Sequence, residues 1–166
     1  MAGALIVTAE LAPPDFSWIE GLRRAHYPVE RNLVPAHLTM FHALPPSAET
    51  EVRGRLARMV LRRAPAATVA GLMDLGGGVA LRIVSAELDD IRDELASALH
   101  GLLGAQDSGG WRPHVTIQNK VPPKQARALK ETLERTFRPR PLLISGLGLQ
   151  RYEEGRWQKL AAYPFR

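Results

Sequence analysis

The amino-acid sequence predicts an α+β fold made of two copies of one unit, each running strand, helix, strand, helix, strand. The first observation behind this prediction is a gapless repeat at a shift of 77 residues, which places His-Leu-Thr-Met at 37–40 on His-Val-Thr-Ile at 114–117. The second is the order of patterns in both copies. Short runs rich in Val and Ile, which indicate strands, alternate with segments whose apolar residues recur every three or four positions, which indicates helices. Self-similarity at a fixed shift indicates a duplicated structural unit.

The repeat extends to both sides of these tetrapeptides. Ile6–Leu11 aligns with Ile83–Leu88, and Leu44–Pro46 aligns with Val121–Pro123. The sequence therefore predicts a single domain made of two units, which span about residues 4–75 and 79–150 of the chain 1–166, with one further strand at the C-terminus.

The first unit opens on a short run rich in Ile and Val, which is typical of a strand. Pro13 and Asp15 mark the start of a helix. Val52, Leu56 and Val60 supply the apolar stripe of a second helix. The predicted elements of this unit are strands at 4–11, 36–44 and 68–75, a helix from residue 13, and a helix at 49–63.

The second unit repeats this order. Leu88, Ile91 and Leu95 recur at helical spacing, and Gly104 ends that run. The glycine run 76–78 is predicted to be a hinge or a tight turn between the units. A phosphate-binding loop is not expected there, because the run lacks the Gly-Lys-Ser/Thr ending and a following helix. The predicted elements are strands at 79–86, 114–121, 142–150 and 156–163, a helix from about Leu88 to the Gly104 stop, and a helix at 124–138.

Composition excludes several classes of function. The chain has no Cys among its 166 residues, which rules out disulfides, zinc ribbons, iron–sulfur clusters and thiol catalysis and favours the cytoplasm. No run approaches the roughly 20 apolar residues of a membrane span, so we expect no membrane contact. The formal charge is +5, and 18 of the 22 basic residues are Arg. This excess of arginine fits a protein that binds an anionic partner. It fits equally well a genome whose composition favours arginine codons.

The repeated tetrapeptides carry the candidate chemistry. Side chains alternate along a strand, so His37 and Thr39 are predicted to share one face, as are His114 and Thr116. The residues that alternate with them are apolar. This pattern is typical of a strand that packs one face on a helix and exposes the other face to a polar environment. If the units pack about a pseudo-twofold axis, two imidazoles and two hydroxyls converge on one cleft.

The paired His-x-Thr-x elements resemble the signatures of the 2H phosphoesterases, which include the RNA 2′,5′-ligase-like proteins and the cyclic phosphodiesterases. The resemblance covers nearly the whole chain, with the duplicated units, the motif separation and Pro113 just before the second His. It implies a bilobal fold whose antiparallel sheets line a central cleft with the helices outside. It also implies metal-independent chemistry on 2′,3′-cyclic phosphates or 2′,5′-phosphodiester linkages.

The residues fit that chemistry. Opening a cyclic phosphodiester needs a base for the attacking water and an acid for the leaving ribose oxygen, and imidazole performs either task near neutral pH. By analogy with the family, His37 is the acid and His114 the base. Hydroxyl groups of Thr39 and Thr116 are expected to stabilise the charged transition state. Two His alone are an incomplete metal-ligand set, so we expect neither a metal nor a cofactor.

Residues beside the motifs are candidates for substrate binding. Phe41 is expected to continue the His37 face and to stack on a base, or else to be part of the core. Gln118 and Lys120 are expected to continue the His114 face. Lys120 or Arg112 is a candidate to hold a phosphate, with plain solvent exposure as the alternative for both. His42 is expected on the opposite strand face from His37, without a catalytic role.

These observations predict a phosphodiesterase that acts on 2′,3′-cyclic phosphate ends of RNA or nucleotides, with reversible 2′,5′ RNA ligation as a further activity. The alternative from another class is a non-catalytic nucleotide- or RNA-binding module that uses the same cleft. A third alternative, an unrelated structural domain, requires the double motif to be a coincidence. A tRNA half, an oligonucleotide end, a cyclic nucleotide and an ADP-ribose derivative all remain candidate substrates.

Overall fold

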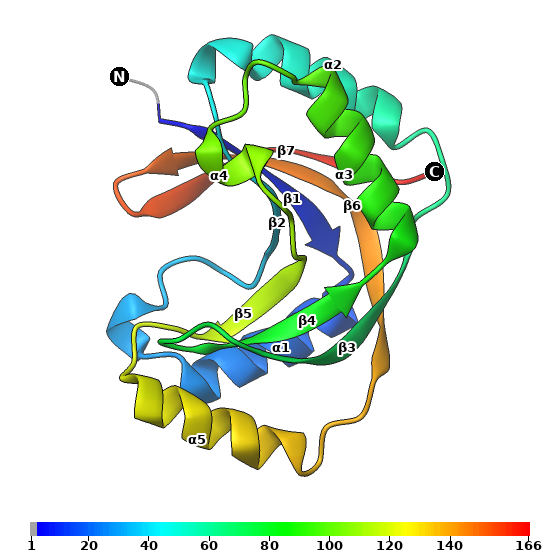
Figure 1. Ribbon diagram of the computed structural model, residues 1–166. Helices are drawn as coiled ribbons and strands as arrows, with labels where there is room; N and C mark the ends of the chain where they lie inside the picture. The colour runs from blue at the N-terminus through cyan, green and yellow to red at the C-terminus, as the bar shows by residue number, and fades with distance from the viewer. Residues whose placement is uncertain (1–2) are drawn as a thin grey trace.

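The computed structural model describes residues 3–166 (Figure 1). All the predicted strands and helices are present, but both second helices are shorter than predicted, because α2 ends at Met59 and α5 at Glu134. The strands are β1 (Leu5–Leu11), β2 (Leu38–Leu44), β3 (Ala66–Asp74), β4 (Val79–Val84), β5 (His114–Gln118), β6 (Arg140–Glu153) and β7 (Arg156–Pro164). The helices are α1 (Pro13–His26), α2 (Glu49–Met59), α3 (Ala86–Ala98), α4 (Ala105–Ser108) and α5 (Pro123–Glu134), with 3₁₀ turns η1 (Val29–Arg31) and η2 (Pro46–Ala48).

The two units exchange their third strands. The strand order is β2-β1-β6-β3-β4-β5, with β7 paired to β6, and every pairing is antiparallel. Each half of the sheet therefore has two strands from one unit and the third from the other, as β2-β1-β6 and β5-β4-β3. β6 joins the halves because its residues 140–143 pair with β3 and its residues 144–151 pair with β1.

Helices cover the outer faces of both halves. α2 and α3 lie above the half that contains β1 and β6, and α1 and α5 lie below β3, β4 and β5 (Figure 1). The buried side chains of both halves form a contiguous hydrophobic cluster. The motif strands β2 and β5 are the two ends of the strand order, and they contact each other. This arrangement confirms the predicted α+β fold with helices on the outside.

The gapless alignment fails at the start of each unit. It places Ala9–Leu11, which lie in β1, on residues 86–88, which begin α3. The Ser85 hydroxyl oxygen accepts a hydrogen bond from the Leu88 N–H at 3.0 Å and so caps α3 directly after β4. In the first unit the strand continues to Leu11, and Pro13 begins the helix. β1 is thus the counterpart of β4, and the shift of 77 residues is kept at the motif strands.

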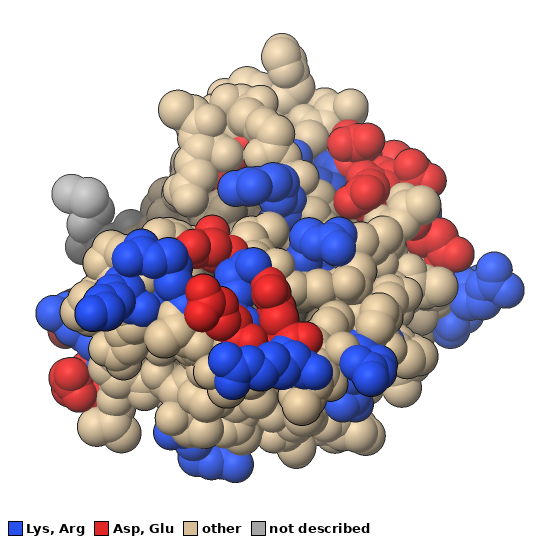
Figure 2. Space-filling model, turned by 60° about the horizontal axis from the view of Figure 1, so that its bottom comes forward, with Lys and Arg blue, Asp and Glu red and all other residues tan. Residues whose placement is uncertain are grey.

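Charged side chains are mixed on the surface over α1 and α5, where Figure 2 shows basic and acidic groups interspersed. On α2, Arg53 pairs with Glu49 at 2.9 Å and Arg55 with Glu51 at 3.9 Å, so these arginines form a solvated, paired helix face. Among residues 3–166, no helix is both long and apolar enough to cross a membrane.

Candidate active site

The two motif histidines are held in the same way. His37 Nδ1 lies 2.7 Å from the Pro35 carbonyl oxygen, and His114 Nδ1 lies 2.8 Å from the Arg112 carbonyl oxygen. A carbonyl oxygen only accepts hydrogen bonds, so each Nδ1 carries the hydrogen and each Nε2 is left as the basic nitrogen. In both units the partner stands two residues before the histidine. The duplicated backbone therefore presents both imidazoles in the same tautomer.

An aromatic ring packs against His37. The ring of Trp157, from β7, lies tilted against the imidazole, at 4.3 Å between centroids and an interplanar angle of 51°. Burial lowers the pKa of His37 to about 4, against a smaller raising effect of the Pro35 carbonyl. Coulombic repulsion, first from Arg23 and then from the neighbouring histidines, lowers the pKa further. His37 is therefore neutral at pH 7.

A β-bulge interrupts the side-chain alternation of both motif strands at the same place. In β2, Thr39 pairs with Thr8 while Phe41 pairs with Val7, so one residue of β2 is extra. In β5, Thr116 pairs with Ala80 while Gln118 pairs with Val79. An extra residue turns the side chains after it to the other face of the sheet. Each bulge falls on the last residue of a His-x-Thr-x element.

The bulges correct two predicted cleft residues. Phe41 is 0% exposed and Gln118 is 2% exposed, so both point into the core. The Arg92 guanidinium lies 4.1 Å from the centre of the Phe41 ring. Strict alternation had placed both side chains beside the histidines, and it fails because it takes no account of the bulge. Phe41 is a core residue, the other interpretation that the sequence allowed for it.

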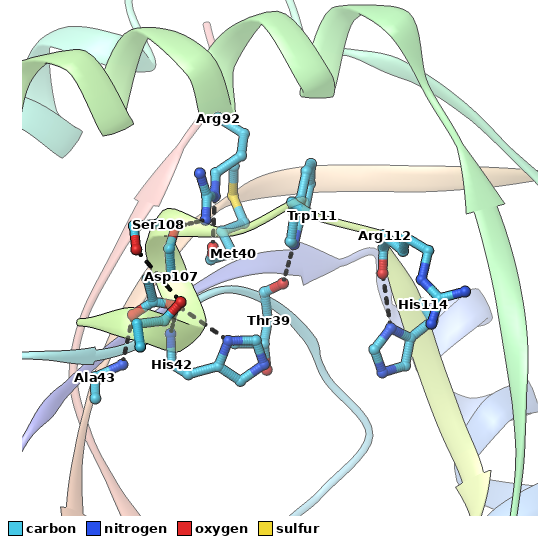
Figure 3. Close-up of polar contacts among 11 residues, drawn as sticks. Thr39, Met40, His42, Ala43, Arg92, Asp107, Ser108, Trp111, Arg112 and His114 are labelled. Carbon is cyan, nitrogen blue, oxygen red and sulfur yellow. Dashed lines mark hydrogen bonds and ion pairs between the residues drawn. The ribbon is translucent and has the colours of Figure 1, made fainter. Parts of the chain in front are cut away.

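The same bulge brings His42 to the face of the motif. Figure 3 shows the His42 ring beside Thr39, with His114 opposite. His42 Nδ1 lies 3.1 Å from Asp107 Oδ1, and its side chain is 35% exposed. The expectation that His42 occupies the opposite face was therefore wrong. The site holds a third imidazole, and its Nδ1 is committed to a carboxylate.

Asp107 lies on α4, in the segment that precedes the second motif, and binds this segment to β2, the strand of the first motif. Its carboxylate is 1% exposed and accepts hydrogen bonds from the backbone N–H groups of His42 at 2.7 Å and Ala43 at 2.9 Å (Figure 3). Burial raises the pKa of Asp107, but the hydrogen bonds and charge of His42 and the Ala43 N–H outweigh it, so the net pKa lies below its ordinary value. The carboxylate is therefore ionised at neutral pH.

Two buried arginines hold the motif strands from the opposite units. Arg23 of α1 donates to the Thr116 carbonyl at 2.7 Å and to the Val34 carbonyl at 2.6 Å. Arg92 of α3 donates to the Met40 carbonyl at 2.8 Å and to the Asp107 carbonyl at 2.7 Å. Each guanidinium thus joins one motif strand to the segment before the other motif. Sequence reasoning missed both, because a helix position alone gives no signal that an arginine is buried.

Thr39 and Thr116 are half-buried, and the other two predicted residues lie at the surface. Arg112 and Lys120 are exposed, and Lys120 has a φ of 63° just beyond the end of β5. Arg82, on β4, was not predicted. It pairs directly with His114, so its side chain leaves the same face of the sheet. Only the strand register reveals this neighbour.

A pocket lies at each motif. The pocket at His37 has a volume of about 230 Å³ and is lined by His37 itself and by Trp157, Glu10 and Lys159 among others. The second pocket has a volume of about 520 Å³ and is lined by Arg112 and Pro113, which directly precede His114, and by Arg82. Within residues 3–166, no three His, Asp or Glu side chains gather as a metal site would require.

Comparisons with known proteins give a family and a fold. A family model described as the 2′-5′ RNA ligase superfamily matches residues 11–156. No curated protein matches the chain. Among solved structures, TT0787 of Thermus thermophilus is similar with a TM-score of 0.68 and 17% identity over 98% of each chain. E. coli LigT complexed with NADP+ has a TM-score of 0.64, and its complex with 3′-AMP has 0.63, each at 17% identity over 99% of both chains. Identities this low show a shared fold.

Proposed function

Because the chain belongs to the 2′-5′ RNA ligase superfamily, we propose that it is a phosphodiesterase that opens 2′,3′-cyclic phosphate ends of RNA or nucleotides. The observation that carries this proposal is that His37 and His114 make the same hydrogen bond, from Nδ1 to the carbonyl oxygen two residues earlier. This bond leaves two imidazole Nε2 atoms for proton transfer. The complexes of LigT with 3′-AMP and NADP+ support nucleotides as ligands of this fold. With the 5′-hydroxyl of a second RNA in place of water as the nucleophile, the same opening of the ring breaks the bond from phosphorus to the 3′-oxygen and joins two RNA ends through a 2′,5′ linkage.

The proposed reaction moves two protons. One imidazole takes a proton from water as the water oxygen attacks phosphorus. The bond from phosphorus to one ribose oxygen breaks, and that oxygen takes a proton from the other imidazole. The hydroxyl groups of Thr39 and Thr116 donate hydrogen bonds to the non-bridging oxygens, whose negative charge grows in the transition state. A screen of 2′,3′-cyclic nucleotides and short RNAs with cyclic ends tests the proposal.

The surroundings of His37 favour the base role for it in the ligand-free protein. Trp157 covers the ring and burial holds its pKa at about 4, so His37 is neutral at pH 7 and ready to accept a proton. This is the reverse of the order that the family analogy implies. A diester with a p-nitrophenolate leaving group decides the order, because such a leaving group needs no acid. The variant that lacks the acid keeps its rate on this substrate, and the variant that lacks the base does not.

The pH profile of kcat/KM is expected to show an acidic limb with a midpoint near pH 4. Protonation of His37 removes the neutral form that the reaction needs, so activity falls as the pH drops through its pKa of about 4. An ordinary histidine would place this limb near pH 6.5. The measurement is kcat/KM on one cyclic nucleotide between pH 3.5 and 9. A limb that stays near 6.5 would contradict the role given to the burial of His37.

Turnover is expected to continue in excess EDTA. The proposed mechanism supplies both proton transfers and the charge stabilisation from His and Thr side chains, and the chain has no Cys to complete a ligand set around two His. The assay compares initial rates before and after dialysis against chelator. Loss of activity that a divalent cation restores would place the protein in a different mechanistic class.

A further inference from the structure

The pocket lined by Arg82, Arg112 and Pro113, just before the second motif, has no part in the two proton transfers. Its volume of about 520 Å³ lies in the range of pockets that hold small ligands. Strands β3 and β4, helix α3 and the segment before the second motif all contribute to its lining. The lining residues that bear on a ligand are Met73, Arg82, Asp89, Asp93, Trp111 and Arg112.

Arg82 ties this pocket to the active site. It is the direct cross-strand partner of His114. Side chains in such a pair leave the same face of the sheet, with their Cβ atoms about 4.5–5.5 Å apart. From there the Arg82 guanidinium extends over β3, 3.5 Å from the Ala70 carbonyl, so a ligand that reaches from His114 into this pocket meets it. Arg112 stands two residues before His114, and its carbonyl holds the ring.

The two arginines have their charge available. Among residues 3–166, neither Arg82 nor Arg112 pairs with a carboxylate. Arg82 makes only a long contact, 3.5 Å from Nη2 to the Ala70 carbonyl. Gly71 leaves room for this guanidinium, since a Cβ there would lie 3.1 Å from Arg82 Nη2. Two unpaired guanidiniums that line one pocket are suited to a phosphate group, which arginine binds in a bidentate manner.

The rest of the lining suits a nucleobase. The Trp111 indole is fixed by a hydrogen bond of 3.0 Å from Nε1 to the Thr39 carbonyl and offers an aromatic surface. Asp89 and Asp93 lie on α3, and partial burial together with the charges of Asp93 and Asp90 raises the pKa of Asp89. Carboxylates accept hydrogen bonds from the exocyclic amino groups of bases, and aromatic side chains stack on base faces.

We propose that this pocket binds the nucleotide next to the reacting one in an oligoribonucleotide. Arg82 and Arg112 hold its phosphate, Trp111 contacts its base, and the carboxylates of α3 accept hydrogen bonds from the base. This inference rests on the proposed phosphodiesterase function and adds a substrate preference to it. The protein favours an oligonucleotide end over a single cyclic nucleotide, because only the longer ligand fills both the active site and this pocket.

The test compares cytidine 2′,3′-cyclic phosphate with the dinucleotide ApC that ends in the same cyclic phosphate. Wild-type protein should show a kcat/KM at least about tenfold higher for the dinucleotide, since one hydrogen bond to a charged group accounts for about a factor of ten. Arg82→Gln should lower kcat/KM for the dinucleotide about tenfold more than for the mononucleotide. Arg127→Gln, an exposed arginine on the outer helix α5, is the matched control and should change neither value.

Equal kcat/KM values of wild-type protein for the two substrates overturn the proposal. Equal losses for both in Arg82→Gln also overturn it, because Arg82 would then act at the reacting phosphate. Calorimetric titration with the 3′-phosphates of C and ApC tests the pocket without turnover. If no cyclic substrate reacts, the phosphodiesterase function fails, and tighter binding of the dinucleotide that is lost in Arg82→Gln still supports the pocket. Equal affinities rule it out.

Discussion

Replacing either His37 or His114 by Ala is expected to lower kcat on a 2′,3′-cyclic phosphate by about 10²–10⁴-fold, the usual contribution of one general acid or base. Both imidazoles carry hydrogen on Nδ1 and present Nε2, and neither takes over the role of the other, because the water and the leaving oxygen lie on opposite sides of phosphorus. The measurement is steady-state kinetics of each variant on one substrate that wild-type protein turns over.

The double variant should be little slower than the slower single variant, since residues that act as a unit are strongly non-additive. Thr39→Ala and Thr116→Ala should cost less in rate and leave the affinity for the product largely unchanged. His100→Ala is the matched control, because His100 is an exposed histidine beyond the end of α3. Near-normal turnover in both single His variants would contradict the acid–base scheme.

Replacing Asp107 by Ala is expected to lower the free energy of unfolding by about 2–5 kcal/mol. The change leaves the backbone N–H groups of half-buried His42 and of Ala43 without their acceptor and removes the contact of Asp107 with the His42 ring, and an unsatisfied donor shielded from water costs about 1–3 kcal/mol. For a chain of this size the melting temperature should fall by about 2–4 °C for each kcal/mol. Denaturant unfolding and a thermal scan measure both quantities.

Two comparisons make the Asp107 prediction specific. Asp90→Ala removes an exposed carboxylate from α3 and should cost less than about 1 kcal/mol. The folded-state pKa of Asp107 is lowered, so its contribution is complete above the ordinary pKa of 3.8 and is lost as the pH falls through the folded pKa. The gap between wild type and Asp107→Ala should therefore narrow in strong acid. An equal cost for the two alanine variants at neutral pH would contradict the anchoring role of Asp107.

The sequence predicted the elements of the fold but not their pairing. Apolar runs and the glycine run that begins at Gly76 mark where strands begin and end, because these signals are local. The exchange of β3 and β6 between the two halves depends on which edges meet in space. Nothing in the alternation of β6 shows that its first residues pair with β3 and the rest with β1.

The sequence predicted only those residues of the candidate site that occur in both copies of the repeat. His37, Thr39, His114 and Thr116 stand out because they occur twice at one shift. The bulge at the end of each motif is a feature of strand register and cannot be seen in the sequence. Strict alternation of side chains therefore put Phe41 on the face of His37 and His42 on the opposite face, and both placements were wrong.

The residues that hold the site gave no sequence signal. Arg23, Arg92 and Asp107 reach their partners across the fold, and each is a common polar residue on a helix. Arg82 is a neighbour of His114 only through the pairing of β4 with β5.

The most direct test of the central claim is to follow a cyclic nucleotide by ³¹P NMR with wild-type protein and with the double variant of His37 and His114. The experiment uses cytidine 2′,3′-cyclic phosphate and the ApC dinucleotide with the same end, in EDTA. The mechanism predicts that wild-type protein replaces the cyclic diester signal by the signal of a single phosphomonoester isomer, because one leaving oxygen is protonated at a fixed place. The double variant should leave the cyclic signal unchanged. No conversion by wild-type protein, or equal conversion by the double variant, would contradict the claim that these two histidines form a phosphodiesterase site.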